Sequence, residues 1–182
     1  MADAVEEREL GSSIWVDPAL QFELLYEQEN DYVSRTIRGI VRTETEVEDL
    51  VQECFARAYR ARHRYRPDAP PGAWLHRIAV NTAISHLRRR RLDQALPLNA
   101  EVPVADRDLQ QAEARATLEE AMAGLSPKVR AAVVLKHFED RSREEIAATL
   151  GIPSGTVASR VAKGMALLRT RLDEAEEDDG DA

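Results

Sequence analysis

The stretch from Trp74 to Arg91, WLHRIAVNTAISHLRRRR, most constrains what this chain can fold into. It combines a helix-length apolar pattern with a polar stripe and four consecutive arginines at its end. At 3.6 residues per turn, one edge of the predicted helix carries Arg77, Asn81, Ser85 and Arg88, and apolar side chains occupy the other sides. A helix of this kind packs on one face and offers cationic and hydrogen-bonding groups on the other. Both a solvated face and a nucleic-acid contact fit this layout, so the rest of the chain must decide between them.

Charge is distributed unevenly along the 182 residues. The net charge is −8, yet residues 32–92 carry thirteen basic and six acidic side chains, and residues 117–172 carry nine and six. A polyanion responds to the local field, which salt screens beyond about 10 Å, rather than to the total charge. The acidic balance of the whole chain therefore does not exclude DNA binding.

The composition, with 43% hydrophobic and 32% charged residues, predicts a globular protein. No run approaches the roughly 18 apolar residues of a membrane span, and the acidic N-terminus lacks the basic-then-apolar order of a signal peptide. We therefore expect a cytoplasmic protein without membrane insertion. The single cysteine, Cys54, allows neither an internal disulfide nor a thiolate zinc cage, and we expect it to be a small buried hydrophobic residue.

Helical periodicity begins near Pro18 and predicts two helices that meet near Asn30, followed by a capping box formed by Thr43 and Glu46. The next predicted helix runs from residue 47 to about residue 62. Its core stripe follows the i, i+3, i+4, i+7 pattern and comprises Val47, Leu50, Val51, Cys54, Phe55 and Ala58.

The outer face of that helix displays Asp49, Gln52 and Glu53, either as solubilising groups or as a docking surface for a basic partner. The next segment interleaves arginines with Tyr59 and Tyr65 before a proline-rich loop. Such a segment suits the binding of an exposed strand, because stacking on an aromatic ring contributes about 1–3 kcal/mol per base. The alternative is that the two tyrosines simply pack against the following helix.

The pattern then dissolves into a proline-containing acidic stretch, which we interpret as an interdomain linker. Helicity resumes near Gln110 and stops at Gly124, and Ser126 with Pro127 predicts the start of the next helix. A further capping box, Ser142 with Glu145, predicts another short helix.

The last two predicted helices have the spacing of a helix-turn-helix. Ala147, Gly151 and Val157 lie across a short Gly-Ile-Pro turn, where a small residue, a turn glycine and a locking apolar residue are needed. The second helix presents polar side chains that suit base edges and phosphates in a major groove: Thr156, Ser159, Arg160 and Lys163.

Three segments in this order together resemble the extracytoplasmic-function (ECF) sigma factors of the sigma-70 family of bacterial RNA polymerase. They read DLVQECFARAYR, PGAWLHRIAVNTAISHLRRRR and LSPKVRAAVVLKHFEDRSREEIAATLGIPSGTVASRVAKGMALLR. The resemblance implies an all-α fold of two small helical domains, the sigma region 2 helical bundle and the sigma region 4 helix-turn-helix, joined by a flexible linker. We expect a disordered acidic extension over residues 1–17, region 2 over 18–92, a linker over 93–112, region 4 over 113–172 and a disordered acidic tail over 173–182.

The resemblance also implies roles for individual residues. The core polymerase-binding residues would be Asp49, Leu50, Gln52 and Glu53. The residues that bind the −10 promoter element would be His63, Arg64, Tyr65, Arg66, Trp74, Arg77, Asn81, Ser85, Arg88, Arg89, Arg90 and Arg91. The residues that bind the −35 element would be Lys136, Ser154, Thr156, Ser159, Arg160 and Lys163.

A member of this family would be an alternative sigma factor that directs core polymerase to specific promoters and assists strand opening. It would not be an enzyme and would need no cofactor or metal. Expected partners are the clamp helices and flap of core RNA polymerase, promoter DNA and an anti-sigma factor. The alternative is a stand-alone helix-turn-helix transcription regulator. We find no phosphate-binding loop or HExxH motif, and we expect the four scattered histidines to be surface or DNA-side residues.

Several positions depart from the family pattern. The recognition helix carries Ala158, Ala162 and Met165 where relatives commonly have basic or larger residues, which predicts weaker −35 binding. Trp74 stands alone where housekeeping sigma factors have paired tryptophans, which suggests weaker promoter melting. The acidic tail is interpreted as a solubilising segment, with screening of the recognition helix as the alternative.

Overall fold

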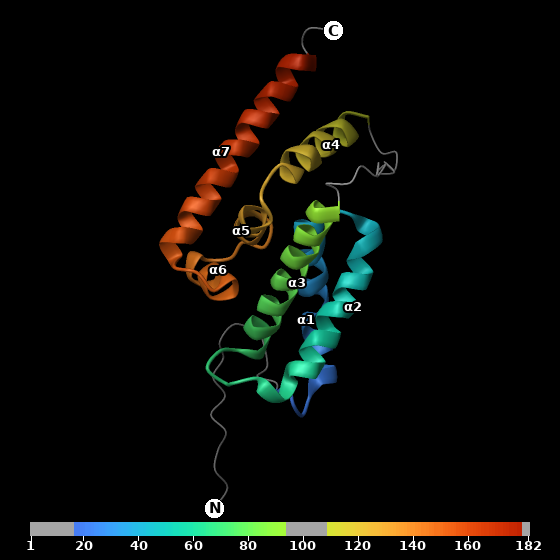
Figure 1. Ribbon diagram of the computed structural model, residues 1–182, viewed down its shortest axis with the longest axis vertical. Helices are drawn as coiled ribbons and strands as arrows, with labels where there is room; N and C mark the ends of the chain where they lie inside the picture. The colour runs from blue at the N-terminus through green and yellow to red at the C-terminus, as the bar shows by residue number, and fades with distance from the viewer. Residues whose placement is uncertain (1–16, 94–108, 180–182) are drawn as a thin grey trace, which may run out of the picture.

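The computed structural model describes residues 17–93 and 109–179, and every regular element in these two ranges is helical. Three α-helices and a short 3₁₀ turn form the N-terminal half (Figure 1): α1 (Phe22–Val41), α2 (Glu44–Ala61), η1 (Arg62–Arg64) and α3 (Pro71–Asp93). Four helices form the C-terminal half: α4 (Leu109–Ala123), α5 (Pro127–His137), α6 (Arg143–Leu150) and α7 (Ser154–Asp179). The predicted all-α architecture is confirmed.

The apolar stripes predicted from sequence form the core. All six residues of the α2 stripe are buried, and Cys54 has no exposed surface. Burial raises the pKa of the Cys54 thiol to about 12, so this side chain behaves as a small hydrophobic residue, as predicted.

Three local predictions for the N-terminal half and the tail were wrong. The region around Asn30 lies inside the single helix α1, because its apolar side chains keep one helical stripe from Leu25 to Val41. Thr43 precedes α2 but its side chain caps no backbone group, because Arg90 donates to its hydroxyl and to the carboxylate of Glu46. The helix expected to end at residue 172 continues to Asp179 as the last part of α7.

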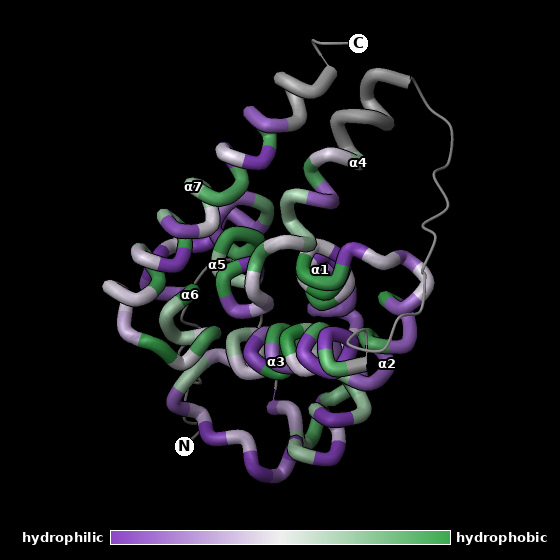
Figure 2. The backbone as a smooth tube through the Cα atoms, turned by 45° about the horizontal axis from the view of Figure 1, so that its top comes forward, coloured by the Kyte–Doolittle hydropathy of each residue, from purple (hydrophilic) through white to green (hydrophobic). Residues whose placement is uncertain are grey.

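The two halves are packed against each other. Helices α1 and α3 contact α5, and α3 also contacts α6. The tube in Figure 2 shows α1 next to α5, and hydrophobic segments from both halves turn toward this seam. A single cluster of buried apolar residues runs through both halves. The sequence, which predicted only a linker between domains, contained no information on this arrangement.

Candidate nucleic-acid interface

Helix α3 presents the polar edge that its sequence predicts. Arg77, Asn81 and Arg88 are exposed and Ser85 is half-buried, so four residues at i, i+4, i+8 and i+11 share one accessible edge. The remaining sides face the core, with buried residues that include Leu75, Ala79, Val80, Thr82, Ala83 and Leu87. The edge is therefore held on a rigid element rather than on a loop.

The loop that leads into α3 is tied to the start of the helix by aromatic contacts. The Tyr65 hydroxyl donates to the Ala69 carbonyl at 2.5 Å. Its ring meets that of Trp74 edge to face, with centroids 5.6 Å apart. Both side chains are half-buried, whereas His63, Arg64 and Arg66 are exposed. Tyr65 thus packs against the following helix, which was one of the two alternatives.

Tyr59 packs in a different direction. Its ring lies edge to face against Phe22 of α1, with centroids 5.2 Å apart, and the Arg62 guanidinium lies 3.7 Å from its centroid. Nearly half of the Tyr59 surface remains exposed. It belongs to an aromatic group at the junction of α1 and α2, away from the aromatic pair at the start of α3.

The four arginines at the end of α3 do not form one uniform cationic group. The Arg89 guanidinium lies 3.8 Å from Glu53, and Arg90 donates to Glu46 at 2.8 Å. Arg91 donates to the Leu125 carbonyl at 2.6 Å, across the seam between the halves. Arg88 belongs to the exposed edge. Three of the four side chains predicted to contact DNA are thus engaged with protein groups in this arrangement.

The acidic face of α2 lies beside the end of α3. Asp49 and Gln52 are exposed, and Glu53 is half-exposed and pairs with both Arg57 and Arg89. Leu50 is 4% exposed and supports the face from the core. Because Leu50 offers no accessible surface, the docking face is formed by its polar neighbours alone.

The helix-turn-helix has the predicted local geometry. The Ser142 hydroxyl accepts from the Glu145 amide at 3.2 Å, and the Glu145 carboxylate accepts from the Ser142 amide at 2.9 Å, which confirms the capping box. These hydrogen bonds lower the pKa of Glu145. Gly151 ends α6 with a φ of 63°, a conformation that favours glycine, and Val157 is 2% exposed.

The residues predicted to read the −35 element lie in the first turns of α7, apart from Lys136. Ser154, Ser159 and Lys163 are exposed, and Thr156 and Arg160 are half-buried. The Ser159 hydroxyl donates to the Thr156 carbonyl. Lys136 lies on α5, where it is exposed and donates to the Arg141 carbonyl at 3.5 Å.

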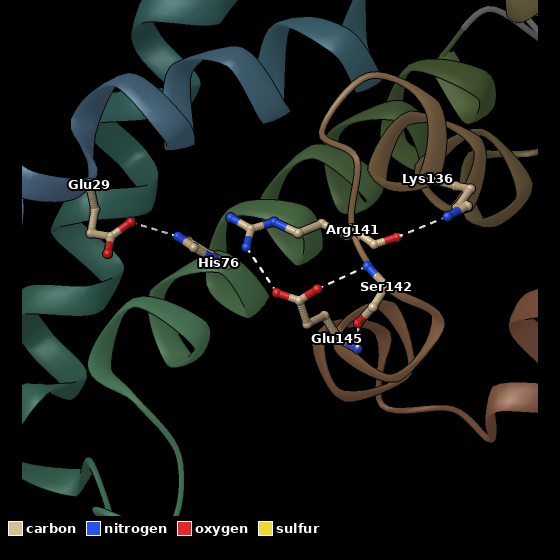
Figure 3. A network of polar contacts seen from close by, with 6 residues as sticks. All are labelled: Glu29, His76, Lys136, Arg141, Ser142 and Glu145. Atoms are coloured by element: carbon tan, nitrogen blue, oxygen red, sulfur yellow. Dashed lines mark hydrogen bonds and ion pairs between the residues drawn. The ribbon is translucent and has the colours of Figure 1, made fainter. Parts of the chain in front are cut away.

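Sequence reasoning missed a buried ion pair that holds the start of α3. Glu29 of α1 is 7% exposed, and its Oε2 lies 2.7 Å from Nε2 of His76. Figure 3 shows this pair beside the loop that carries Arg141. One signal was available: Glu29 falls on the apolar stripe of α1, four residues after Leu25 and four before Val33. The expectation that the histidines lie at the surface was wrong for His76, which stacks on Tyr32 with centroids 3.7 Å apart.

His86 is a second exception among the histidines. Its side chain is 15% exposed and lies 3.3 Å from Glu46. In the part of the chain that the structure describes, no three histidine, cysteine or acidic residues are grouped so that they could hold a metal ion. No helix within residues 17–93 and 109–179 has the length and apolar character needed to cross a membrane.

The fold and the exposed edges define a class: an all-helical protein with a helix-turn-helix and a second helical unit that offers a basic, polar helix edge. Comparison with known families agrees with this division. Residues 25–92 match the model of sigma-70 region 2, and residues 115–168 match that of sigma-70 region 4.

Curated relatives cover both regions together. The chain is 35% identical over 151 residues to the ECF RNA polymerase sigma factor SigM of Mycobacterium tuberculosis, covering 83% of this chain and 76% of the relative. It is 39% identical to the ECF RNA polymerase sigma factor SigE of Mycolicibacterium smegmatis, where the match covers 81% of this chain but spans 60% of that relative's length. The chain belongs to the ECF sigma factors of the sigma-70 family, the alternative sigma factors that direct RNA polymerase to promoters.

A solved structure shares the fold. The sigma factor RpoE in complex with the anti-sigma factor NepR from Bartonella quintana is 25% identical and gives a TM-score of 0.64, covering 84% of this chain and 96% of that one. None of the comparisons supports the alternative of a stand-alone helix-turn-helix regulator.

Proposed function

We propose that this chain binds core RNA polymerase through the acidic face of α2, defined by Asp49, Gln52 and Glu53. The observation that supports this most directly is that the face is exposed and lies beside the DNA-facing edge of α3, from which Arg89 reaches Glu53. A protein bound there would lie next to the strand that α3 contacts. Charged surface groups chiefly determine partner choice and association rate, so an acidic face favours a basic partner surface such as the clamp helices.

The −10 element is assigned to the edge of α3 together with the loop before it. Arg77, Asn81 and Arg88 offer exposed donors on a rigid helix, and Trp74 with Tyr65 supports the loop. Extrusion of a base from the duplex costs a few kcal/mol, which a pocket and aromatic stacking can offset. Polymerase supplies the chemistry of transcription, and this chain supplies sequence choice and part of the free energy of strand opening.

The −35 element is assigned to the first turns of α7. Ser159 and Lys163 are exposed there, and the turn before the helix has the geometry that places a second helix in the major groove. The small residues Ala158 and Ala162 are also exposed. Fewer cationic side chains on this face mean fewer phosphate contacts, so −35 binding is weak and depends on polymerase. An anti-sigma factor is a further expected partner.

The test is the double substitution Asp49→Arg with Glu53→Arg. We expect binding to purified core polymerase to fall by about 100-fold, because reversing two charges on an interface replaces attraction with repulsion. The matched control is Asp173→Arg with Glu174→Arg, which makes the same charge change at two exposed positions of α7. Unchanged polymerase affinity in the α2 variant, with its helical content intact, would contradict the proposal.

A further inference from the structure

The seam between the halves has a function of its own. We propose that the face of α5 and the α5–α6 loop that packs on α1 and α3 is an intramolecular docking surface. Docking there keeps the free protein in a closed state that cannot engage both promoter elements, and polymerase binding must release it. This inference rests on the proposed function, because it concerns the regulation of the same DNA-facing edges.

The centre of the seam is a close helix contact that a glycine permits. A Cβ at Gly39 of α1 would stand 2.9 Å from a methyl group of Val134 in α5 and 3.9 Å from its Cβ. Val134 is 1% exposed, and most of its surroundings in α5 are buried as well. The two helices therefore touch with interior packing, which a loosely tethered pair of domains would not show.

A buried arginine connects the ends of two helices across this contact. Arg130 of α5 is 5% exposed, and its guanidinium donates to the carbonyls of Ile40 at 3.1 Å and Ala123 at 3.0 Å. These carbonyls lie in the last turns of α1 and α4, where the helix dipole is negative and backbone acceptors lack helical partners. Arg91 of α3 makes the reciprocal contact, donating to the Leu125 carbonyl just after α4.

The same site contains an opposing force that makes release possible. Burial first, and then the nearby charges of Arg91, Arg42 and Arg90, lower the pKa of Arg130 to about 10. Four cationic groups thus gather at one end of the seam, with Glu119 in an ion pair with Arg42 at 3.4 Å. Interfaces between domains that are polar in this way are typically reversible.

The rim of the seam is polar and aromatic. The Arg141 guanidinium from the α5–α6 loop lies 4.5 Å from the centroid of the Tyr32 ring on α1 and also donates to Glu145. Figure 3 shows Arg141 reaching from this loop toward the Glu29–His76 pair. The buried pair under Tyr32 stiffens the surface on which Arg141 lies.

The closed arrangement is incompatible with simultaneous contact to both promoter elements. The Arg77 guanidinium on the edge of α3 lies 3.1 Å from the position that a Cβ on Gly151 would occupy, so this edge adjoins the turn of the helix-turn-helix. Elements centred near −10 and −35 are about 25 base pairs apart, or roughly 85 Å at about 3.4 Å per base pair. The halves must therefore separate before both can be bound.

A disulfide across the seam tests this directly. In Gly39→Cys with Val134→Cys, the Cβ positions are 3.9 Å apart, within the range of about 3.5–4.5 Å that disulfides require. The native Cys54 is buried with a raised pKa and does not interfere. We expect the bond to form within the free full-length chain under mild oxidation. Run-off transcription by the locked chain with core polymerase should fall by about tenfold or more, because the competent population is removed, and dithiothreitol should restore it in the same sample.

Each single-cysteine variant, treated identically, is the control and should transcribe like the native chain. Two results would overturn the inference: failure of the bond to form in a folded double variant, or full transcription by the locked chain. Failure of the native chain to support transcription would instead count against the proposed function, and the yield of cross-link would still report whether the chain closes.

A wedge at the same contact gives the opposite change. Gly39→Gln places a long side chain against Val134 in the closed state, whereas in an open chain glutamine is a better helix former than glycine. The radius of gyration of the free chain, measured by small-angle scattering, should increase, and its binding to a duplex with a −35 element should rise several-fold. An unchanged radius in the folded variant would overturn the inference without involving polymerase.

Discussion

The two helices that carry the DNA-facing residues are held in opposite ways. Helix α3 is enclosed by α1, α2, α5 and α6 and exposes one edge, whereas α7 packs against α4, α5 and α6 and leaves both its recognition face and much of its later turns exposed. The edge of α3 is positioned by contacts between segments distant in sequence. The recognition face of α7 is positioned by a local turn. Helix α3 should therefore respond to substitutions far from DNA, and α7 to substitutions at its one close packing contact.

The largest expected effect is at that packing contact of α7. A Cβ at Gly164 would stand 3.0 Å from Val129 and also meets Val133, both on α5. Gly164→Leu should lower the free energy of unfolding by about 3 kcal/mol, because overpacking a buried helix contact forces the two helices apart. Urea denaturation followed by circular dichroism measures this change.

The matched control for that substitution is Gly155→Ala on the same helix. A Cβ there meets nothing within 4 Å, so stability should be unchanged or rise by up to about 1 kcal/mol through helix propensity. Equal destabilisation by both substitutions would show that α7 tolerates no side chain for reasons other than packing.

The next effect tests how α3 is held. Glu29→Ala leaves His76 buried without its carboxylate partner, and we expect a loss of about 2 kcal/mol. Open-complex formation should fall as well, since the start of α3 loses its anchor. Glu27→Ala, an exposed glutamate on the same helix, is the control and should change stability by less than about 0.5 kcal/mol. A near-zero effect of Glu29→Ala would mean that the edge of α3 does not depend on this pair.

A third prediction separates support from contact within α3. Trp74→Ala should cost about 1–2 kcal/mol, because the half-buried ring packs on the core and on Tyr65. Asn81→Ala should leave stability within about 0.5 kcal/mol, because the side chain is exposed. Both should reduce open-complex formation more than closed-complex binding, as measured by permanganate footprinting and gel shift. Equal losses at both steps for Asn81→Ala would argue against a strand contact.

The smallest effect is a pH dependence from the same buried pair. Burial lowers the pKa of His76, although the hydrogen bond and charge of Glu29 partly oppose this and Arg141 reinforces it. Between the folded and unfolded pKa values the unfolded chain binds more protons. The contribution of His76 to stability is therefore complete above the unfolded pKa, about 6.5, and is lost as pH falls through the folded pKa. Unfolding curves between pH 7 and pH 5 should be flatter for His76→Gln than for the control His63→Gln, which alters an exposed histidine. Identical slopes would contradict the assignment.

How well the site could be predicted from sequence differs between the two helices. The capping box at Ser142, the turn at Gly151 and the locking residue Val157 were all predicted, because each depends on residues within a few positions. The exposed edge of α3 was predicted from periodicity for the same reason. The prediction failed at Thr43, where the capping geometry lost to Arg90, a residue 47 positions away.

The sequence by itself determined the helices, the helix-turn-helix and the family, because hydrophobic periodicity and turn chemistry act over one or two helical turns. The tertiary structure alone decided which charged side chains remain available. Arg91 and Arg130 bind helix carbonyls across the seam, and Glu29 enters the core to meet His76. The separations involved range from 34 to 90 residues for these cross-chain bonds. No local pattern specifies such partners, because they depend on how complete helices pack.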